Sequence, residues 1–394
     1  MTVFVAGTGA VCAAGNGVQT GYHALIKGQD YLKPYVHPDL ASTTMPLCAQ
    51  VECDLEILAG REGMFRTLAL ATVAAGEAIA ALPDRNNLRL GIVAATTVGG
   101  ISQTERAYRQ YRIDPESRTS FAVECAVHEP VVLASELCRM TAANGFHTVS
   151  TACSSSLHAI GMAKRLIERD YYDACLVVGA DALCITTVRG FGSLTLLDPN
   201  GCRPFDKNRA GISLGEGAGA MLLVGREFLE RCSDGALARI SGWGASSDCY
   251  HMTAPHPEGA GARKAIEGAL REAQLSPEAI DAVVSHGTGT PDNDKSEVAV
   301  LKTLFGTIPP FCSLKRIIGH TLAASGILEA VFAVSMLHNQ HLPPTAGFME
   351  MDEEIGANPF AGGPLPMRHI LKSAFGFGGN NAAVILSGNE GGVA

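Results

Sequence analysis

The sequence predicts an α/β fold in which buried strands alternate with helices. Short apolar runs recur along the chain, and the longer segments between them place their apolar residues at helical spacing. The runs do not alternate with polar residues, so we expect helices to cover both faces of the strands. With 394 residues, 47% of them hydrophobic and 18% charged, the chain is long enough for two domain-sized cores.

The first strand is expected at residues 3–7, where the chain reads VFVAG. The first lysine is Lys27, so no positively charged segment precedes this run, and we interpret it as a buried strand and not as a signal peptide. Similar apolar runs predict further strands at 90–97, 175–181, 219–225, 282–288 and 382–388. Helical spacing predicts helices at 65–81, 155–169, 261–274, 294–305 and 322–339.

An internal echo divides the chain into two similar halves. VFVAGTGAV at the start resembles RISGWGASS at 239–247, and each reads as a strand followed by Gly-x-Gly. The polar stretch EFLERCSDGALAR suits a surface connection, so we place the halves at 1–230 and 231–394. Neither copy completes a dinucleotide-binding fingerprint, because Cys12 stands where the first copy requires its third glycine.

Composition excludes several classes of function. The net charge of −9 gives nucleic-acid binding no electrostatic basis, and no uninterrupted apolar run reaches about 18 residues, so we expect no membrane span. The 12 cysteines include no Cys-x-x-Cys pair, so we expect no metal site. Most cysteines lie in apolar surroundings, which is typical of reduced core residues in a cytoplasmic protein.

One cysteine has a different setting. Cys153 lies in STACSSS, and the helical pattern LHAIGMAKRLIERD follows at once. Small neighbours let a bulky substrate reach the sulfur, and a helix that starts at or near Cys153 directs unpaired N–H groups and its positive dipole end at it. We expect this environment to favour the thiolate, which is the nucleophilic form. A buried structural cysteine is the alternative.

Two histidines occupy positions where α/β proteins place reactive groups. His286, in SHGTGTPDND, follows an apolar strand and precedes a glycine-rich turn, and His320, in SLKRIIGHTLAASGILE, lies at the start of a predicted helix. Loops at such places present side chains to a cleft. Other histidines, such as His158, His338 and His341, are expected to be packing or surface residues.

Five motifs follow one another along the chain. They are TACSSS around Cys153, CRPFDKNRAGISLGEGAGAMLL at 202–223, HGTGTPDNDKSE from His286, SLKRIIGHTLAASGILEA around His320 and SAFGFGGNNAAVIL from Ser373. In this order they resemble the signatures of the β-ketoacyl-ACP synthases, over nearly the whole chain. The resemblance implies the thiolase-like fold, in which two similar halves pack as five αβαβα layers. It also implies the activity of a 3-oxoacyl-[acyl-carrier-protein] synthase, an acyltransferase.

The reaction that the resemblance implies is a decarboxylating Claisen condensation. Cys153 accepts an acyl group, and its backbone N–H and that of Phe377 form the oxyanion hole. Neutral His286 and His320 donate hydrogen bonds to the thioester oxygen of malonyl-ACP, which becomes negative as CO₂ leaves. The enolate attacks acyl-Cys153 and gives 3-oxoacyl-ACP, in fatty acid or type II polyketide or polyene synthesis.

The resemblance gives supporting roles to further charged residues. Lys315 and Glu329 match an ion pair that holds His320 in this family, and a solvated surface pair is the alternative. Asp294 and Glu297 are expected to order the loop after His286, with exposed helix residues as the alternative.

Phe377, within FGFGG, matches a mobile gate beside the nucleophile, and its flanking glycines give the backbone freedom to move. For Val98 in TTVGGI and Phe191 in RGFGSL, which match acyl-pocket positions, core packing is an equally good explanation. The substrate-binding positions implied by the resemblance are Val98, Phe191, Thr288, Thr290, Gly376 and Gly378.

The chain departs from the family pattern in several motifs. AVECAVHEPVVLASEL replaces the usual proline-containing entry to the helix before the nucleophile, NRAG replaces DRDG, and GGNN replaces GGTN. Cys153, His286 and His320 remain in place. The departures put the acyl specificity in doubt and favour a dedicated polyketide or polyene pathway.

Two rival functions share the implied fold. A non-catalytic partner of the chain-length-factor type, in a ketosynthase heterodimer, would lack the nucleophile, whereas this chain keeps Cys153 and both histidines. A biosynthetic thiolase would use a second cysteine as its base, and no other cysteine has the context of His286 or His320.

The resemblance implies that both substrates arrive on the phosphopantetheine of acyl carrier protein and that the enzyme binds no cofactor of its own. These carriers are acidic, so we expect basic side chains at the tunnel mouth, with Arg61, Arg66 and Arg118 as candidates and a solvated face as the alternative.

The family pairs two subunits, and HTVSTAC is compatible with a strand that pairs across a twofold axis. We expect a homodimer, or a heterodimer with a related subunit.

Overall fold

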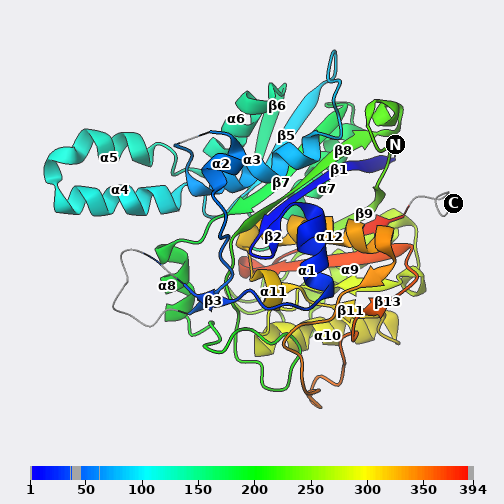
Figure 1. Ribbon diagram of the computed structural model, residues 1–394. Helices are drawn as coiled ribbons and strands as arrows, with labels where there is room; N and C mark the ends of the chain where they lie inside the picture. The colour runs from blue at the N-terminus through cyan, green and yellow to red at the C-terminus, as the bar shows by residue number, and fades with distance from the viewer. Residues whose placement is uncertain (1, 36, 38–45, 62, 389–394) are drawn as a thin grey trace.

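The computed structural model describes residues 2–35, 37, 46–61 and 63–388. Within these residues, the strands of the main sheet follow one path in the order β11-β10-β14-β15-β9-β1-β8-β7-β5-β6 (Figure 1). The path contains two groups, because β1 and β9 pair only through Phe4 with Arg239 and Val5 with Ala238. The first group is β1 (Val3–Cys12), β5 (Leu90–Ala95), β6 (Gly145–Val149), β7 (Ala174–Asp181) and β8 (Gly217–Gly225). The second is β9 (Ala238–Ser247), β10 (Ala282–Val284), β11 (Phe311–Cys312), β14 (His369–Gly376) and β15 (Asn380–Ser387).

The two groups repeat one strand order and one set of directions. From the outer edge, β6-β5-β7 and β11-β10-β14 are parallel, and β8-β1 and β15-β9 continue the two groups antiparallel. This order relates β1 to β9, the strands that carry the sequence echo. The boundary near residue 230 stays a proposal, supported by this repeat and by the position of η2 (Arg226–Arg231) between β8 and β9.

Helices cover the strand groups in layers. α7 (Ser155–Glu168) and α12 (Ser325–Asn339) lie in the middle and contact strands of both groups. α3 (Arg66–Ile79) packs on the first group, and α9 (Ala260–Ala273) packs on the second with α10 (Pro291–Phe305) beside it. The predicted α/β fold with five αβαβα layers is therefore confirmed.

The middle layer explains the most apolar helical stretch. Leu322–Asn339 is long and apolar enough to cross a membrane, but 89% of it is buried inside the protein. Strands of both groups pack on α12, and such a helix must be apolar nearly all round. We therefore interpret it as the core helix of the fold.

The observed elements lie close to the predicted ones, with informative differences. β10 ends at Val284 instead of residue 288, because the chain turns at Gly287 (φ 40) and leaves His286 in a loop. β14 is not visible as an apolar run because it carries Lys372 and Ser373. α4 (Ile101–Ile113) lacks an apolar face because it buries only Ala107.

The remaining elements connect the layers. α4 and α5 (Arg118–Cys125) form a hairpin that projects from the body (Figure 1). The other helices are α1 (Val18–Ile26), α2 (Leu55–Ala59), α6 (Pro130–Thr141), α8 (Ile185–Ser193) and α11 (Lys315–Ile318), with short 3₁₀ turns η1 (Pro115–Ser117), η3 (Pro277–Ala279), η4 (Leu322–Ala324) and η5 (Phe377–Gly379). Short strands are β2 (Gly15–Asn16), β3 (Lys33–Pro34), β4 (Leu47–Cys48), β12 (His341–Leu342) and β13 (Gly363–Pro364).

Candidate active site

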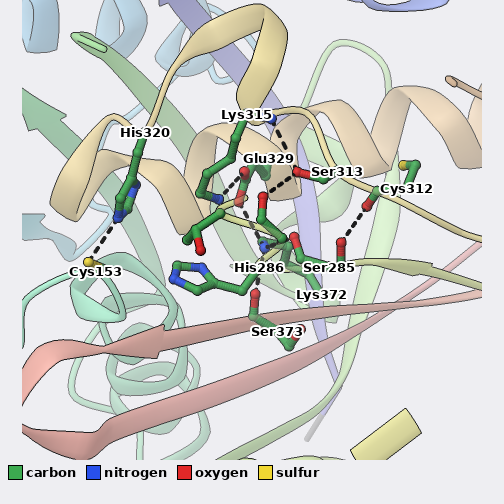
Figure 2. Close-up of polar contacts among 12 residues, drawn as sticks. Cys153, Ser285, His286, Cys312, Ser313, Lys315, His320, Glu329, Lys372 and Ser373 are labelled. Carbon is green, nitrogen blue, oxygen red and sulfur yellow. Dashed lines mark hydrogen bonds and ion pairs between the residues drawn. The ribbon is translucent and has the colours of Figure 1, made fainter. Parts of the chain in front are cut away.

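The predicted catalytic side chains meet at the carboxyl ends of the strands. Cys153 follows β6, His286 follows β10 and Phe377 follows β14, while His320 precedes α12. Figure 2 shows Cys153, His286 and His320 facing one another from separate segments. All four residues line a cavity of about 350 Å³, a size typical of small-molecule sites.

Local backbone geometry presents Cys153 to this cavity. Ala152 has φ 53, so the chain turns sharply before the cysteine, and α7 begins two residues after it at Ser155. The Sγ atom accepts hydrogen bonds from the backbone N–H groups of Cys153 and Phe377. The two N–H groups thus converge beside the sulfur, as an oxyanion hole for a bound acyl group requires.

The protonation state of Cys153 differs from the expectation. Cys153 is 6% exposed, and burial raises the pKa of its thiol to about 11, although Lys315 and the N–H of Phe377 act to lower it. The expected preference for the thiolate is therefore wrong for the free site, because desolvation outweighs these favourable contacts. The thiol has to lose its proton as it attacks.

The two histidines occupy different positions around the thiol. His320 Nε2 lies 2.9 Å from Cys153 Sγ, whereas the His286 ring centroid lies 5.5 Å from that of His320. One nitrogen of each ring and the sulfur all lie within 4.8 Å of one another. Within the described chain, Nδ1 of neither ring has a hydrogen-bond partner, whereas Nε2 of His320 has the Cys153 thiol beside it.

Both imidazoles are held neutral. Burial lowers the pKa of His286 and of His320 well below the usual value, and the Lys315 ammonium lowers it further. Lys372, which is buried on β14, acts in the same direction. A neutral imidazole can donate an N–H to an oxyanion or accept a proton from a thiol.

The predicted ion pair between Lys315 and Glu329, which supports His320, is present. Lys315 Nζ lies 2.7 Å from Glu329 Oε1 and both side chains are fully buried, so the surface alternative is wrong. Lys372 Nζ lies 2.8 Å from Glu329 Oε2, a contact that the sequence did not reveal. Burial alone would raise the pKa of Glu329, but the two lysines outweigh it and hold this pKa below its usual value. In the sequence, only the presence of a lysine within the stretch HILKSAFG could have indicated that Lys372 takes part in the site.

Two buried carboxylates order the loop after His286, as predicted. Glu297 accepts the backbone N–H of His286 at 2.7 Å and that of Gly287 at 2.8 Å. Asp294 accepts the backbone N–H of Thr288 at 3.1 Å. Both carboxylates are buried, so the alternative of exposed helix residues is wrong.

Asp181, at the end of β7, is a fully buried carboxylate that sequence reasoning missed. It accepts hydrogen bonds from Thr96 Oγ1 at 2.5 Å, the Val98 N–H at 2.9 Å and the Ala323 N–H at 2.8 Å. The sequence signal that could have identified Asp181 is its position at the end of the apolar run CLVVGAD. Val98 packs in a hydrophobic cluster and is not among the cavity-lining residues, so the structure favours the core-packing explanation for Val98.

Two phenylalanines close one side of the cavity. The rings of Phe191 and Phe377 stack with their centroids 5.6 Å apart and an interplanar angle of 22°. Thr288 and Thr290, whose hydroxyl oxygens lie 2.8 Å apart, line the cavity together with Gly376. Of the predicted substrate-binding residues, Phe191, Thr288, Thr290 and Gly376 therefore line the cavity, as does the gate residue Phe377.

The turn around Phe377 needs glycine on both sides. A Cβ at Gly376 would lie 2.8 Å from the Thr151 carbonyl oxygen, and Gly378 adopts φ 79. Gly378 is not among the cavity-lining residues, and its N–H donates to the Met252 carbonyl at 2.7 Å. Motion of Phe377 as a gate stays a prediction.

The close approach of Cys153, His286 and His320 would also satisfy the distances of a metal site. A metal-bound cysteine must be a thiolate, whereas burial raises the pKa of this thiol to about 11. The expectation that the site binds no metal stays a prediction, and elemental analysis of the purified protein tests it.

Comparison with known proteins matches both parts of the chain to one family. Residues 59–227 match the β-ketoacyl synthase N-terminal domain, and residues 237–349 match the β-ketoacyl synthase C-terminal domain. The chain belongs to the β-ketoacyl synthase family. A 3-oxoacyl-[acyl-carrier-protein] synthase 2 from Vibrio cholerae is 31% identical over 98% of this chain and 98% of its own length.

Solved ketosynthase structures share the fold. The ishigamide ketosynthase/chain length factor matches with a TM-score of 0.92 and 27% identity, over 98% of this chain and 99% of that chain. A ketosynthase solved in complex with its chain length factor from Xenorhabdus doucetiae matches with a TM-score of 0.82 and 30% identity, over 98% of both chains. The expected thiolase-like fold is confirmed.

Proposed function

We propose that this chain catalyses the decarboxylating Claisen condensation of an acyl group, carried on Cys153, with malonyl-ACP to give 3-oxoacyl-ACP. The observation that carries the proposal is a single cavity lined by a thiol, two neutral imidazoles and the Phe377 turn, whose N–H reaches the sulfur. Each group meets one requirement of the reaction.

Acylation of Cys153 is the first step. The sulfur attacks the carbonyl carbon of an acyl thioester while the thiol proton passes to His320 Nε2, which lies 2.9 Å away. The N–H groups of Cys153 and Phe377 stabilise the oxyanion. The bond between the acyl carbon and the carrier sulfur then breaks, and the departing thiolate takes the proton from His320.

Malonyl-ACP reacts in the second step. The bond between its carboxylate carbon and its α-carbon breaks, CO₂ leaves, and the electron pair forms an enolate with its charge on the thioester oxygen. Neutral His286 donates an N–H group to that oxygen, and neutral His320 does so in the tautomer that carries its single ring proton on Nε2, since acylated Cys153 no longer offers a proton to this nitrogen. The enolate carbon bonds to the acyl carbon, the bond to Cys153 breaks, and the released thiolate takes one proton from solvent.

The geometry separates two histidines that the sequence treated alike. His320 contacts the sulfur, so it can serve acylation as well as decarboxylation. The side-chain contacts of His286 are with the His320 and Phe375 rings, which points to decarboxylation alone.

The rival functions fit the cavity less well. A non-catalytic chain-length-factor-type partner has no need of a thiol held by two N–H groups beside a histidine. A thiolase would need a second cysteine at the cavity, and Cys153 is the single cysteine among the cavity-lining residues of the described chain.

Acyl carrier protein is the proposed partner, with no cofactor beyond its phosphopantetheine, and the cytoplasm is the proposed location. Arg66 Nε donates to the buried Glu216 at 2.8 Å, so Arg66 serves the fold. Arg61 is exposed and stays a candidate for docking, and the side chain of Arg118 lies outside the described part of the chain.

The chain is similar both to a 3-oxoacyl-ACP synthase and to ketosynthase/chain length factor proteins, so it is compatible with either a fatty acid or a polyketide pathway.

Product analysis tests this function. The protein is incubated with malonyl-ACP and a panel of acyl-ACP thioesters, and products are identified by mass spectrometry, with Cys153→Ala as the control. We expect 3-oxoacyl-ACP two carbons longer than the accepted acyl group. Long saturated products would indicate fatty acid synthesis. Acceptance of only polyunsaturated or keto-bearing chains would indicate a specialised pathway. Absence of extension and of CO₂ release across the panel would contradict the proposal.

A further inference from the structure

Lys372 is a buried cation that the mechanism above does not use. It lies on β14, where its neighbours on the same face, Ile370 and Ala374, pack into the hydrophobic core. Lys372 is 0% exposed, and burial lowers the pKa of its ammonium group. Replacing a buried ion pair by apolar residues is often neutral or stabilising, so fold stability alone does not explain a lysine at this position.

The contacts of Lys372 lead to His286. Its Nζ donates to the Ser285 carbonyl at 3.1 Å and to the Ser373 carbonyl at 2.5 Å, and Ser285 immediately precedes His286 (Figure 2). Glu297 holds the same segment from the other side, since it accepts the His286 N–H at 2.7 Å and the Ser373 hydroxyl at 3.0 Å. The peptide that carries His286 is therefore fixed by a buried cation and a buried carboxylate.

Glu329 connects this arrangement to the second histidine. Lys372 Nζ lies 2.8 Å from Glu329 Oε2, and Lys315 Nζ, five residues before His320, lies 2.7 Å from Glu329 Oε1. One carboxylate thus links the segments that carry both imidazoles, whose ring centroids are 5.5 Å apart. Two N–H groups that stabilise one enolate oxygen must keep a fixed separation, so this link controls the geometry that decarboxylation needs.

We propose that Lys372 is a positioning residue for decarboxylation, which holds His286 relative to His320 through the Ser285 carbonyl and Glu329. The inference rests on the function proposed above. Acylation uses Cys153, His320 and the Phe377 N–H. Lys372 makes no hydrogen bond or ion pair with these residues in the described structure, and it affects His320 only through its charge, after burial and Lys315. Loss of Lys372 should therefore separate the two half-reactions.

The test compares Lys372→Met with Lys164→Met. For Lys372→Met we expect kcat for CO₂ release from malonyl-ACP to fall roughly 10- to 100-fold, with KM within about threefold, because a displacement of about 1 Å costs about 100-fold. Single-turnover acylation of Cys153 should change by less than about threefold. Lys164 is the matched control because it is also buried and paired, with Glu168 and Glu272 at 2.5 Å, away from the cavity. Its replacement should leave both half-reactions unchanged.

Equal losses in both half-reactions of Lys372→Met, or no loss in either, would overturn the proposal, since a packing role predicts no split. Rates are expressed per Cys153 that can be acylated, so a partly folded preparation still gives an answer. Lys372→Gln keeps a donor for the Ser285 carbonyl, and its CO₂ release should lie between wild type and Lys372→Met. Equal impairment of its two half-reactions would also count against the proposal. Wild-type protein that releases no CO₂ would instead contradict the proposed function.

Discussion

At the scale of single residues, desolvation raises the pKa of Cys153 more than the sequence suggested. A helix start and small neighbours indicated a thiolate at Cys153, yet burial raises the pKa of this thiol to about 11. The thiol therefore depends on His320 Nε2, 2.9 Å away, to accept its proton during attack. Motifs placed the reactive residues correctly, but pKa depends on the three-dimensional surroundings, which no local pattern contains.

The pKa of Cys153 leads to a prediction for alkylation. Because the folded-state pKa is about 11, the thiolate fraction, and with it the rate of reaction with iodoacetamide, should rise roughly tenfold for each pH unit between pH 7 and pH 10. Peptide mapping by mass spectrometry isolates Cys153 from exposed Cys249. A rate for Cys153 that is already constant above pH 8 would show that the site holds a thiolate.

Replacement of the nucleophile, Cys153, leads to a second prediction about a single residue. Cys153→Ala should fold normally and accept no acyl group from acyl-ACP, because Cys153 is the single cysteine lining the cavity of the described chain. Intact-protein mass spectrometry after exposure to acyl-ACP measures this. Acylation of the variant at another residue would refute the assignment.

Among the elements, backbone turns set the positions of the catalytic side chains. Gly319 has φ 67 and ψ 174 directly before His320, a conformation that only glycine adopts readily. A Cβ there would lie 2.6 Å from the Gly215 Cα, while the His320 N–H donates to the Ser213 carbonyl at 2.7 Å. The position of the segment between α11 and η4, which carries His320, therefore depends on close backbone contact at Gly319.

We expect Gly319→Ala to lower the free energy of unfolding by about 1–3 kcal/mol, through backbone strain, and to reduce condensing activity by displacing His320. Gly76→Ala is the control, because Gly76 lies within α3 and a Cβ there has no atom within 4 Å. That change should stabilise the protein by roughly 0.5–1 kcal/mol. Urea unfolding compares the two variants, and a Gly319→Ala midpoint equal to that of wild type would contradict this account.

Sequence patterns predicted some elements better than others for physical reasons. Strands buried on both faces, such as β5 and β7, are continuous apolar runs and were expected. β14 was not, because Lys372 within it is paired by Glu329 from a distant helix. α4 and α5 were not expected either, because α4 buries only Ala107 and so has no apolar stripe.

For the whole molecule, the exposed sheet edge indicates a partner subunit. β6 is the last strand of the sheet path, its residues are partly exposed, and Phe146 is 40% exposed. An edge strand of this kind offers unpaired backbone groups to a second chain. We expect a homodimer, or a heterodimer with a related subunit, by light scattering at micromolar concentration. A monomer with full condensing activity would contradict this expectation.

The most direct test of the account measures both half-reactions in His286→Ala and His320→Ala. Single-turnover transfer to Cys153 reports acylation, and release of labelled CO₂ from malonyl-ACP reports decarboxylation. Loss of one donor that faces developing charge typically costs ~10²–10³ in rate, or about 3–4 kcal/mol. We predict this loss of CO₂ release in both variants, with acylation nearly unchanged in His286→Ala and reduced in His320→Ala, whose Nε2 contacts the thiol. Normal CO₂ release by His286→Ala together with failed acylation would show that His286 is a base for the thiol, and would contradict the account.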